Sequence, residues 1–182
     1  FVDVDKNKEY TEGVDTINDE SGNGKRDTDP LGELQALPTL VNLYLYDNLL
    51  ESTLLIKDLP NLKILLLAGN KLEDITNLGG FKSLIRLTLS DNRITNIDGL
   101  EGLTELEHLY LEENQVSDIR TLRRLNALLE VRLQRNQLVS INTMKELKEL
   151  RVVSLSGNFI HDPTPVFDLP ELKRVSLSSN CI

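Results

Sequence analysis

An asparagine recurs every 22 residues along most of the chain, and this spacing constrains the fold more than any other feature. The series consists of Asn48, Asn70, Asn92, Asn114, Asn136, Asn158 and Asn180. The same apolar frame precedes each asparagine, as Leu106, Leu109 and Leu111 do before Asn114. A fixed period of about 20–50 residues is typical of solenoids, in which each unit packs on its neighbours. Residues 37–182 therefore hold six complete repeats and a 14-residue seventh.

The spacing within one repeat indicates its local structure. Leucines two residues apart, such as Leu87 and Leu89, point to the same side of a short strand. Strands stacked in parallel about 4.8 Å apart would bring these leucines into one continuous core. The asparagine follows the strand, where its amide can satisfy buried backbone groups that the turn leaves unpaired. The second half of the repeat carries apolar residues three apart, which suits 3₁₀ turns.

The frame resembles the L-x-x-L-x-L-x-x-N-x-L motif of the leucine-rich repeat family, in its short 22-residue class. That class includes a protein-phosphatase regulatory subunit and the bacterial internalins. The resemblance covers about four-fifths of the chain. It implies an α/β leucine-rich-repeat solenoid with a curved parallel β-sheet on the concave face and 3₁₀ or irregular turns on the convex face. Two repeats depart from the frame at Thr53 and Pro163, so we expect both to be distorted on the convex side.

Composition excludes several classes of function. The net charge of −9 argues against binding to nucleic acid or to an anionic lipid surface. No apolar run is long enough to insert into a membrane, and the single cysteine, Cys181, forms no internal disulfide. The two histidines, His108 and His161, lie two repeats apart and form no catalytic arrangement with a nucleophile. The sequence therefore predicts a protein without enzymatic activity.

Residues 1–30 form an acidic segment with nine acidic and four basic side chains. On composition alone this segment resembles a disordered tail. Its spacing, however, resembles the D-x-N-x-N-G-x-x-D calcium loops of secreted bacterial proteins, because alternate oxygen ligands suit a loop wrapped around Ca²⁺. The second loop would bind through the side chains of Asp19, Ser21, Asn23 and Asp27 and the backbone carbonyl of Lys25. The first would bind through the side chains of Asp3, Asp5, Asn7 and Thr11 and the backbone carbonyl of Glu9.

The calcium loops depart from the pattern in one respect. The bidentate glutamate expected at the twelfth position is replaced by Val14 in the first loop and by Pro30 in the second. Only the second loop has the glycine, Gly24, that the turn favours. Weak loops of this kind would fill with Ca²⁺ only outside the cytosol, so they favour an extracellular, cell-surface or periplasmic location. Residues 31–36 are expected to cap the first repeat. The C-terminal end shows no cap in the sequence, so we expect either that further domains follow it or that something else covers the last edge of the core.

The concave face, formed by strand residues that point away from the core, is called the strand face below. Its first five strands combine aromatic, aliphatic and charged residues, which is the composition of a protein-binding hot spot. The predicted partner-binding residues are Tyr44, Tyr46, Ile64, Leu66, Arg86, His108, Tyr110, Glu112, Glu113, Glu130, Arg132 and Arg135. Alternatively, tyrosine and arginine occur here because they pack well along neighbouring strands. The last two strands carry mostly serine and glycine, and Arg120, Arg123 and Arg124 are interpreted as solvated convex-side charges.

The leading hypothesis is a secreted or cell-surface bacterial protein that binds a partner protein through its concave face. In that hypothesis, Ca²⁺ stabilises the N-terminal segment. One alternative is an intracellular regulatory scaffold with a disordered acidic tail. A second alternative is a structural spacer domain within a larger envelope protein.

Overall fold

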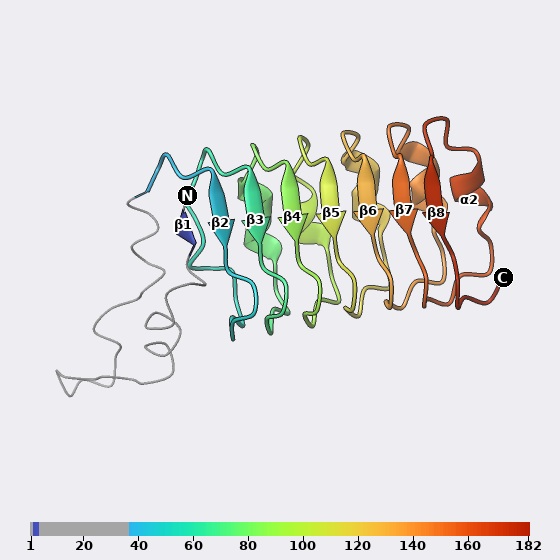
Figure 1. Cartoon of the computed structure of the whole chain (residues 1–182), viewed down its shortest axis with the longest axis horizontal. Helices are drawn as coiled ribbons and strands as arrows, with labels where there is room; N and C mark the ends of the chain where they lie inside the picture. The colour runs from blue at the N-terminus through green and yellow to red at the C-terminus, as the bar shows by residue number, and fades with distance from the viewer. Residues whose placement is uncertain (1, 4–36) are drawn as a thin grey trace.

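The computed structural model describes residues 2–3 and 37–182. Eight short parallel strands form one sheet, and each strand pairs with the next along the chain (Figure 1). The strands are β1 (Val2–Asp3), β2 (Asn42–Tyr44), β3 (Ile64–Leu66), β4 (Arg86–Thr88), β5 (His108–Tyr110), β6 (Glu130–Arg132), β7 (Val152–Ser154) and β8 (Arg174–Ser176). This arrangement confirms the predicted leucine-rich-repeat solenoid.

The register of the sheet follows the 22-residue period. From β2 onwards, residues at the same position of successive repeats face each other, as Leu65, Leu87 and Leu109 do. All three leucines are fully buried, and they belong to one apolar core that runs through the described repeats. The residues on either side of each leucine therefore point to the opposite side of the sheet.

The recurring asparagines form a hydrogen-bonded ladder beneath the sheet. Asn114 is 7% exposed, and its Nδ2 donates to the carbonyl oxygens of Leu89 at 2.9 Å and Leu111 at 3.2 Å. Its Oδ1 accepts from the backbone N–H of Ile94 at 2.9 Å. Asn92 and Asn136 repeat this pattern one repeat away on either side. Each of these three asparagines thus satisfies backbone groups of its own repeat and of the preceding one, as the sequence predicts.

Short helical turns lie behind the sheet (Figure 1). Four central repeats each contain a 3₁₀ helix: η3 (Thr76–Gly80), η4 (Asp98–Leu100), η5 (Arg120–Arg124) and η6 (Asn142–Glu146). The repeats that carry Thr53 and Pro163 differ, as expected. The described residues between β2 and β3 form no 3₁₀ helix, and the repeat with Pro163 has the short α-helix α2 (Thr164–Phe167).

Thr53 shows why the first repeat departs from the others. It is fully buried at a position where the next repeats have isoleucine, and its hydroxyl hydrogen-bonds to the Asn77 side chain. Asn77 Nδ2 in turn donates to the Thr53 carbonyl oxygen at 2.8 Å. A polar side chain at this buried position therefore has a polar partner in the following repeat.

The N-terminal strand β1 is not predicted by the repeat frame. It pairs with β2 in parallel, with Val2 opposite Leu43 and Asp3 opposite Tyr44. Of the predicted calcium ligands only Asp3 has a described backbone, whereas the others lie outside the described residues, as does the predicted cap at 31–36.

Candidate functional site

Alternation along each strand places the candidate residues on the strand face. In β5, Leu109 is buried in the core, and His108 and Tyr110 on either side of it are half-buried on the opposite surface. The same alternation holds for β2, β3, β6 and β7. Because neighbouring strands are in register, outward residues of successive repeats form columns that cross the sheet.

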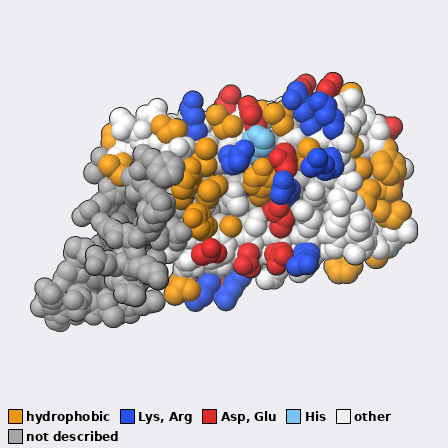
Figure 2. All heavy atoms as spheres, in the orientation of Figure 1, with side chains coloured by type: hydrophobic (Ala, Val, Ile, Leu, Met, Phe, Trp, Pro, Cys, Tyr) orange, Lys and Arg blue, Asp and Glu red, His pale blue; other side chains and the backbone are white. Residues whose placement is uncertain are grey.

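The strand face divides into three zones (Figure 2). Hydrophobic side chains gather over β2 and β3, side chains of both charges lie over β4 to β6, and mainly uncharged polar groups cover β7 and β8. The apolar zone comprises Tyr44, Tyr46, Ile64 and Leu66, which are all half-buried. The two tyrosines also make contacts within the chain.

The charged zone is centred on Glu130 in β6. Arg132 Nε and Nη2 contact Glu130 Oε1 at 2.8 Å and 2.7 Å, and Tyr110 Oη donates to Glu130 Oε2 at 3.0 Å. His108 Nδ1 lies 3.5 Å from the same Oε2. The Arg132 guanidinium also lies over the Tyr110 ring, 4.9 Å from its centroid, a cation–π arrangement. We call His108, Tyr110, Glu130 and Arg132 the Glu130 cluster.

Local interactions shift the pKa values of three groups in the Glu130 cluster. Partial burial acts to raise the pKa of Glu130, but hydrogen bonds from Arg132 and Tyr110 outweigh burial and lower it. Burial and the hydrogen bond to Glu130 raise the pKa of Tyr110. The hydrogen bond to Glu130 raises the pKa of Arg132. At neutral pH the cluster therefore holds a carboxylate, a guanidinium and a neutral phenol in fixed relative positions.

Two more candidate residues, Glu112 and Glu113, follow β5. Glu112 accepts a hydrogen bond from the Ser90 hydroxyl, and its Oε1 lies 4.0 Å from Arg132 Nη1. Glu113 Oε1 accepts a hydrogen bond at 2.8 Å from Nη1 of Arg135 in the next repeat. The structure thus brings Glu112 beside the Glu130 cluster and joins Glu113 to Arg135 at the end of the strands.

Glu113 and Arg135 belong to a column with left-handed backbone conformation. All seven residues at this position have positive φ: Asp47, Gly69, Asp91, Glu113, Arg135, Gly157 and Ser179. Aspartate and glycine tolerate this conformation, so the glycines in the column are the sequence signal for it. These residues direct the chain away from the sheet, and their side chains lie at the end of the strands.

Two polar side-chain atoms within the described residues are buried without a hydrogen-bond partner. They are His108 Nδ1 and Gln134 Oε1, and both belong to outward positions of the strand face. Buried polar atoms are nearly always hydrogen-bonded in native proteins, and each exception calls for an explanation such as a bound water, an ion or a functional role. The occurrence of both on neighbouring repeats, next to Glu130 and Glu112, singles out this part of the surface.

A pocket of about 580 Å³ lies beside these residues, and sequence reasoning did not identify it. Its lining comes from four successive repeats: Glu112, Glu113, Gln134, Arg135, Ser156, Gly157, Ser176 and Ser179. We call it the Gln134 pocket. Long side chains follow β5 and β6, whereas serine and glycine line the pocket from the next two repeats. This difference in side-chain size is the sequence feature that could have predicted the pocket.

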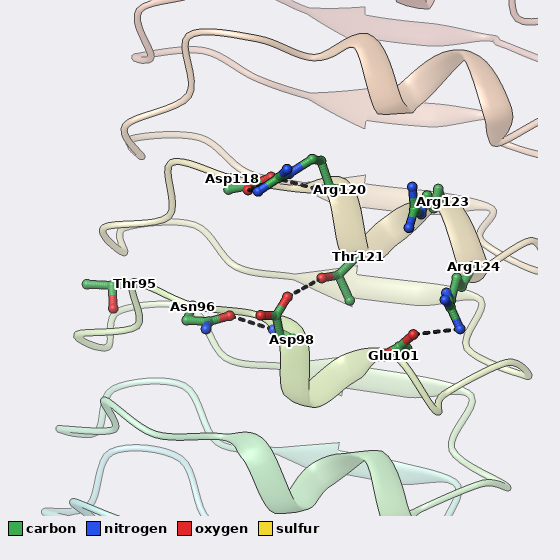
Figure 3. Close-up of a pocket in the computed structure, with 9 residues that line it drawn as sticks. All are labelled: Thr95, Asn96, Asp98, Glu101, Asp118, Arg120, Thr121, Arg123 and Arg124. Carbon is green, nitrogen blue, oxygen red and sulfur yellow. Dashed lines mark hydrogen bonds and ion pairs between the residues drawn. The ribbon is translucent and has the colours of Figure 1, made fainter.

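A second pocket, of about 550 Å³, lies on the convex side between η4 and η5 (Figure 3). Its charged groups are mostly paired with one another. Arg120 contacts Asp118 at 2.6 Å, Arg124 contacts Glu101 at 2.6 Å, and Thr121 donates to Asp98 at 2.6 Å. Hydrogen bonds from Arg120 lower the pKa of Asp118. These pairs leave little uncompensated charge for a ligand.

Two other features are absent from the described residues. No three or more histidine, cysteine, aspartate or glutamate side chains are placed to hold a metal ion in residues 37–182. No helix in the part of the chain that the structure describes has the length and apolarity to cross a membrane.

Known proteins share this architecture. A family model described as leucine-rich repeats in two copies matches residues 82–124. An internalin C2 of Listeria monocytogenes has 32% sequence identity and a TM-score of 0.69, over 80% of this chain and 74% of that protein. The chain belongs to the leucine-rich repeat family.

Two further solved structures are similar to this leucine-rich repeat protein. An internalin, InlF, from Listeria monocytogenes has 27% identity and a TM-score of 0.79, over 82% of this chain and 44% of the internalin. A leucine-rich repeat protein of Leptospira interrogans has 28% identity and a TM-score of 0.70, over 78% and 38% of the two chains. The chain thus spans less than half the length of both proteins. No curated protein sequence matches it significantly.

Proposed function

We propose that this leucine-rich repeat protein is a non-enzymatic recognition module that binds a partner protein through its strand face. The observation that carries the proposal is the contrast between zones of that face. Strands β2 to β6 present aromatic, aliphatic and arginine side chains, whereas β7 and β8 present mostly small polar ones. Tyrosine and arginine surrounded by polar groups are enriched at interface hot spots.

The geometry of the Glu130 cluster supports this role. Its charged groups hold Tyr110 and Arg132 in one arrangement, so a partner would meet side chains that are already ordered. Pre-ordered side chains reduce the conformational entropy that binding costs. The apolar zone beside the cluster supplies surface that gains from removal of water.

Capture experiments test this function. A partner retained by the wild-type protein is identified and purified. Its Kd for the wild type is then compared with its Kd for the Tyr44→Ala/Tyr110→Ala variant. We expect the double variant to lose binding with little change in melting temperature, because both side chains point away from the core. Ser154→Ala/Ser178→Ala on the uncharged part of the same face is the matched control and should bind normally. Undiminished binding by the tyrosine variant would contradict the proposed surface.

We also infer a secreted or cell-surface bacterial location and calcium-stabilised N-terminal loops. The support is the D-x-N-x-N-G-x-x-D spacing at residues 19–27 and the similarity to proteins of Listeria monocytogenes and Leptospira interrogans. Weak calcium loops fill where Ca²⁺ is millimolar, which is outside the cytosol.

Calorimetric titration of Ca²⁺ into the chelator-treated protein tests the loops. We expect saturable binding that Asp19→Ala/Asp27→Ala removes. A ligand at 100 times its Kd that binds only the folded state adds about 2.7 kcal/mol to stability, so thermal unfolding gives a second readout. Absence of heat and of a melting shift at millimolar Ca²⁺ would instead favour the intracellular scaffold with an acidic tail.

A further inference from the structure

The Gln134 pocket contains one acceptor that lacks a donor and one carboxylate that is hydrogen-bonded at only one of its oxygens. Gln134 Oε1 is buried without a hydrogen-bond partner. The neighbouring Glu112 side chain is 20% exposed, yet Arg132 Nη1 remains 4.0 Å from its Oε1, beyond hydrogen-bonding distance. Glu112 Oε2 accepts a hydrogen bond from the Ser90 hydroxyl, so the carboxylate retains hydrogen-bonding capacity at Oε1.

The two acceptors lie side by side. Glu112 and Gln134 occupy the same outward position of successive repeats, two residues after the ends of the paired strands β5 and β6. The backbone N–H of Glu113 donates to the Gln134 carbonyl oxygen at 2.9 Å, so the two segments remain adjacent where the strands end. Adjacent strands are about 4.8 Å apart, which separates the two side chains by a distance that one planar group with several donors can bridge.

The charge of the pocket favours a cation. Its charged lining residues are Glu112, Glu113 and Arg135. Arg135 is paired with Glu113 at 2.8 Å, and Arg132, which lies outside the lining, is 4.0 Å from Glu112. The lining residues themselves therefore carry a net charge of −1. The serine and glycine residues opposite leave open space in front of the Glu112 carboxylate.

We propose that the Gln134 pocket accepts an arginine side chain of the partner protein, an inference that rests on the proposed function. The guanidinium donates to the Glu112 carboxylate and to Gln134 Oε1, which rotates from its buried position to meet it. Side-chain rotations of this kind are common when proteins bind. Arginine fits better than lysine because the N–H groups of its planar guanidinium can donate to two acceptors at once, whereas the lysine ammonium is a compact point charge.

The test is an NMR titration of the full chain with N-acetyl-arginine N-methylamide at constant ionic strength. We expect saturable shifts of the backbone amides of Gln134, Arg135 and Gly157. The citrulline analogue has nearly the same shape but no charge, and it should bind at least tenfold more weakly. Gln134→Met and Glu112→Gln should each weaken arginine binding, whereas Gln115→Met changes an exposed glutamine outside the pocket and should not.

Equal shifts with arginine and citrulline, no saturable shift, or preference for an N-acetyl-glutamate probe would each overturn the assignment. The result is separable from the test of the proposed function. If Tyr44→Ala/Tyr110→Ala abolishes partner binding but the arginine probe does not bind, only the pocket assignment fails. If the probe binds but the tyrosine variant retains the partner, the pocket stands and the proposed interface is wrong.

Discussion

The inward and outward positions of the same strands differ in how much their residues vary between repeats. Inward positions hardly change between repeats, as Leu87, Leu109 and Val131 show, and all three are fully buried. The outward positions one residue later are Thr88, Tyr110 and Arg132, which share neither size nor charge. Within one chain, repetition therefore marks the residues that build the solenoid, and variation marks those available for recognition. Three experiments test this division, and their expected effects decrease from the first to the third.

Leu109→Ala should be the most damaging of the three changes. It removes a fully buried side chain from the continuous core, which costs about 2–5 kcal/mol in comparable proteins. Its neighbour Tyr110→Ala is the control, because Tyr110 is half-buried on the opposite side of the sheet and should cost clearly less. Urea unfolding of both variants gives the free energies of unfolding. Similar losses would mean that the strand face contributes to stability as much as the core does.

Asn114→Ala should have an intermediate effect. The change leaves the carbonyl oxygen of Leu89 and the N–H of Ile94 without their side-chain partner, at a cost of about 1–3 kcal/mol. Gln115→Ala, at the exposed position that follows, is a matched control and should be near neutral. An unchanged unfolding midpoint for Asn114→Ala would show that water can hydrogen-bond to these two backbone groups as well as the Asn114 side chain does.

Glu130→Gln should have the smallest effect, about 1 kcal/mol or less at neutral pH, because ion pairs near the surface contribute little. The pKa of Glu130 is lowered in the folded protein, so its stabilising contribution is present above its ordinary value of 4.5. It is lost as the pH falls through the lowered pKa. Unfolding midpoints of the wild type and the variant should therefore converge between pH 5 and the acid limit of folding. A difference between the two unfolding midpoints that stays constant as the pH falls would contradict the lowered pKa of Glu130.

Much of the fold was predictable because the 22-residue period fixes both the register and the burial of each position. Leucine pairs predicted strands, asparagine predicted the ladder, and Thr53 and Pro163 predicted the two repeats with altered convex sides. Strand β1 was not predicted, since it comprises two residues outside the repeat frame. A pairing that short depends on tertiary contact and leaves no periodic signal.

The candidate site was predictable as a surface but not as a network. The columns identified Glu130, Arg132 and Tyr110 as neighbours, because register alone determines which outward residues are adjacent. They did not determine that Tyr110 and Arg132 both contact Glu130, since such contacts depend on side-chain rotamers. The Gln134 pocket was not predictable in the same way, because a hollow forms only where small residues such as Ser156 and Gly157 lie beside long side chains, and composition alone does not place them there.

The asparagine ladder also determines how the protein can change in length. The side chain of Asn114 joins residues 20 and 25 positions earlier, and Asn136 does the same one repeat later. A gene that gains or loses whole 22-residue units preserves all of these offsets. Insertion of any other number of residues between two asparagines shifts one partner away from the other. Evolution and protein engineering alike can thus lengthen the strand face by entire repeats, each of which brings a new set of outward side chains.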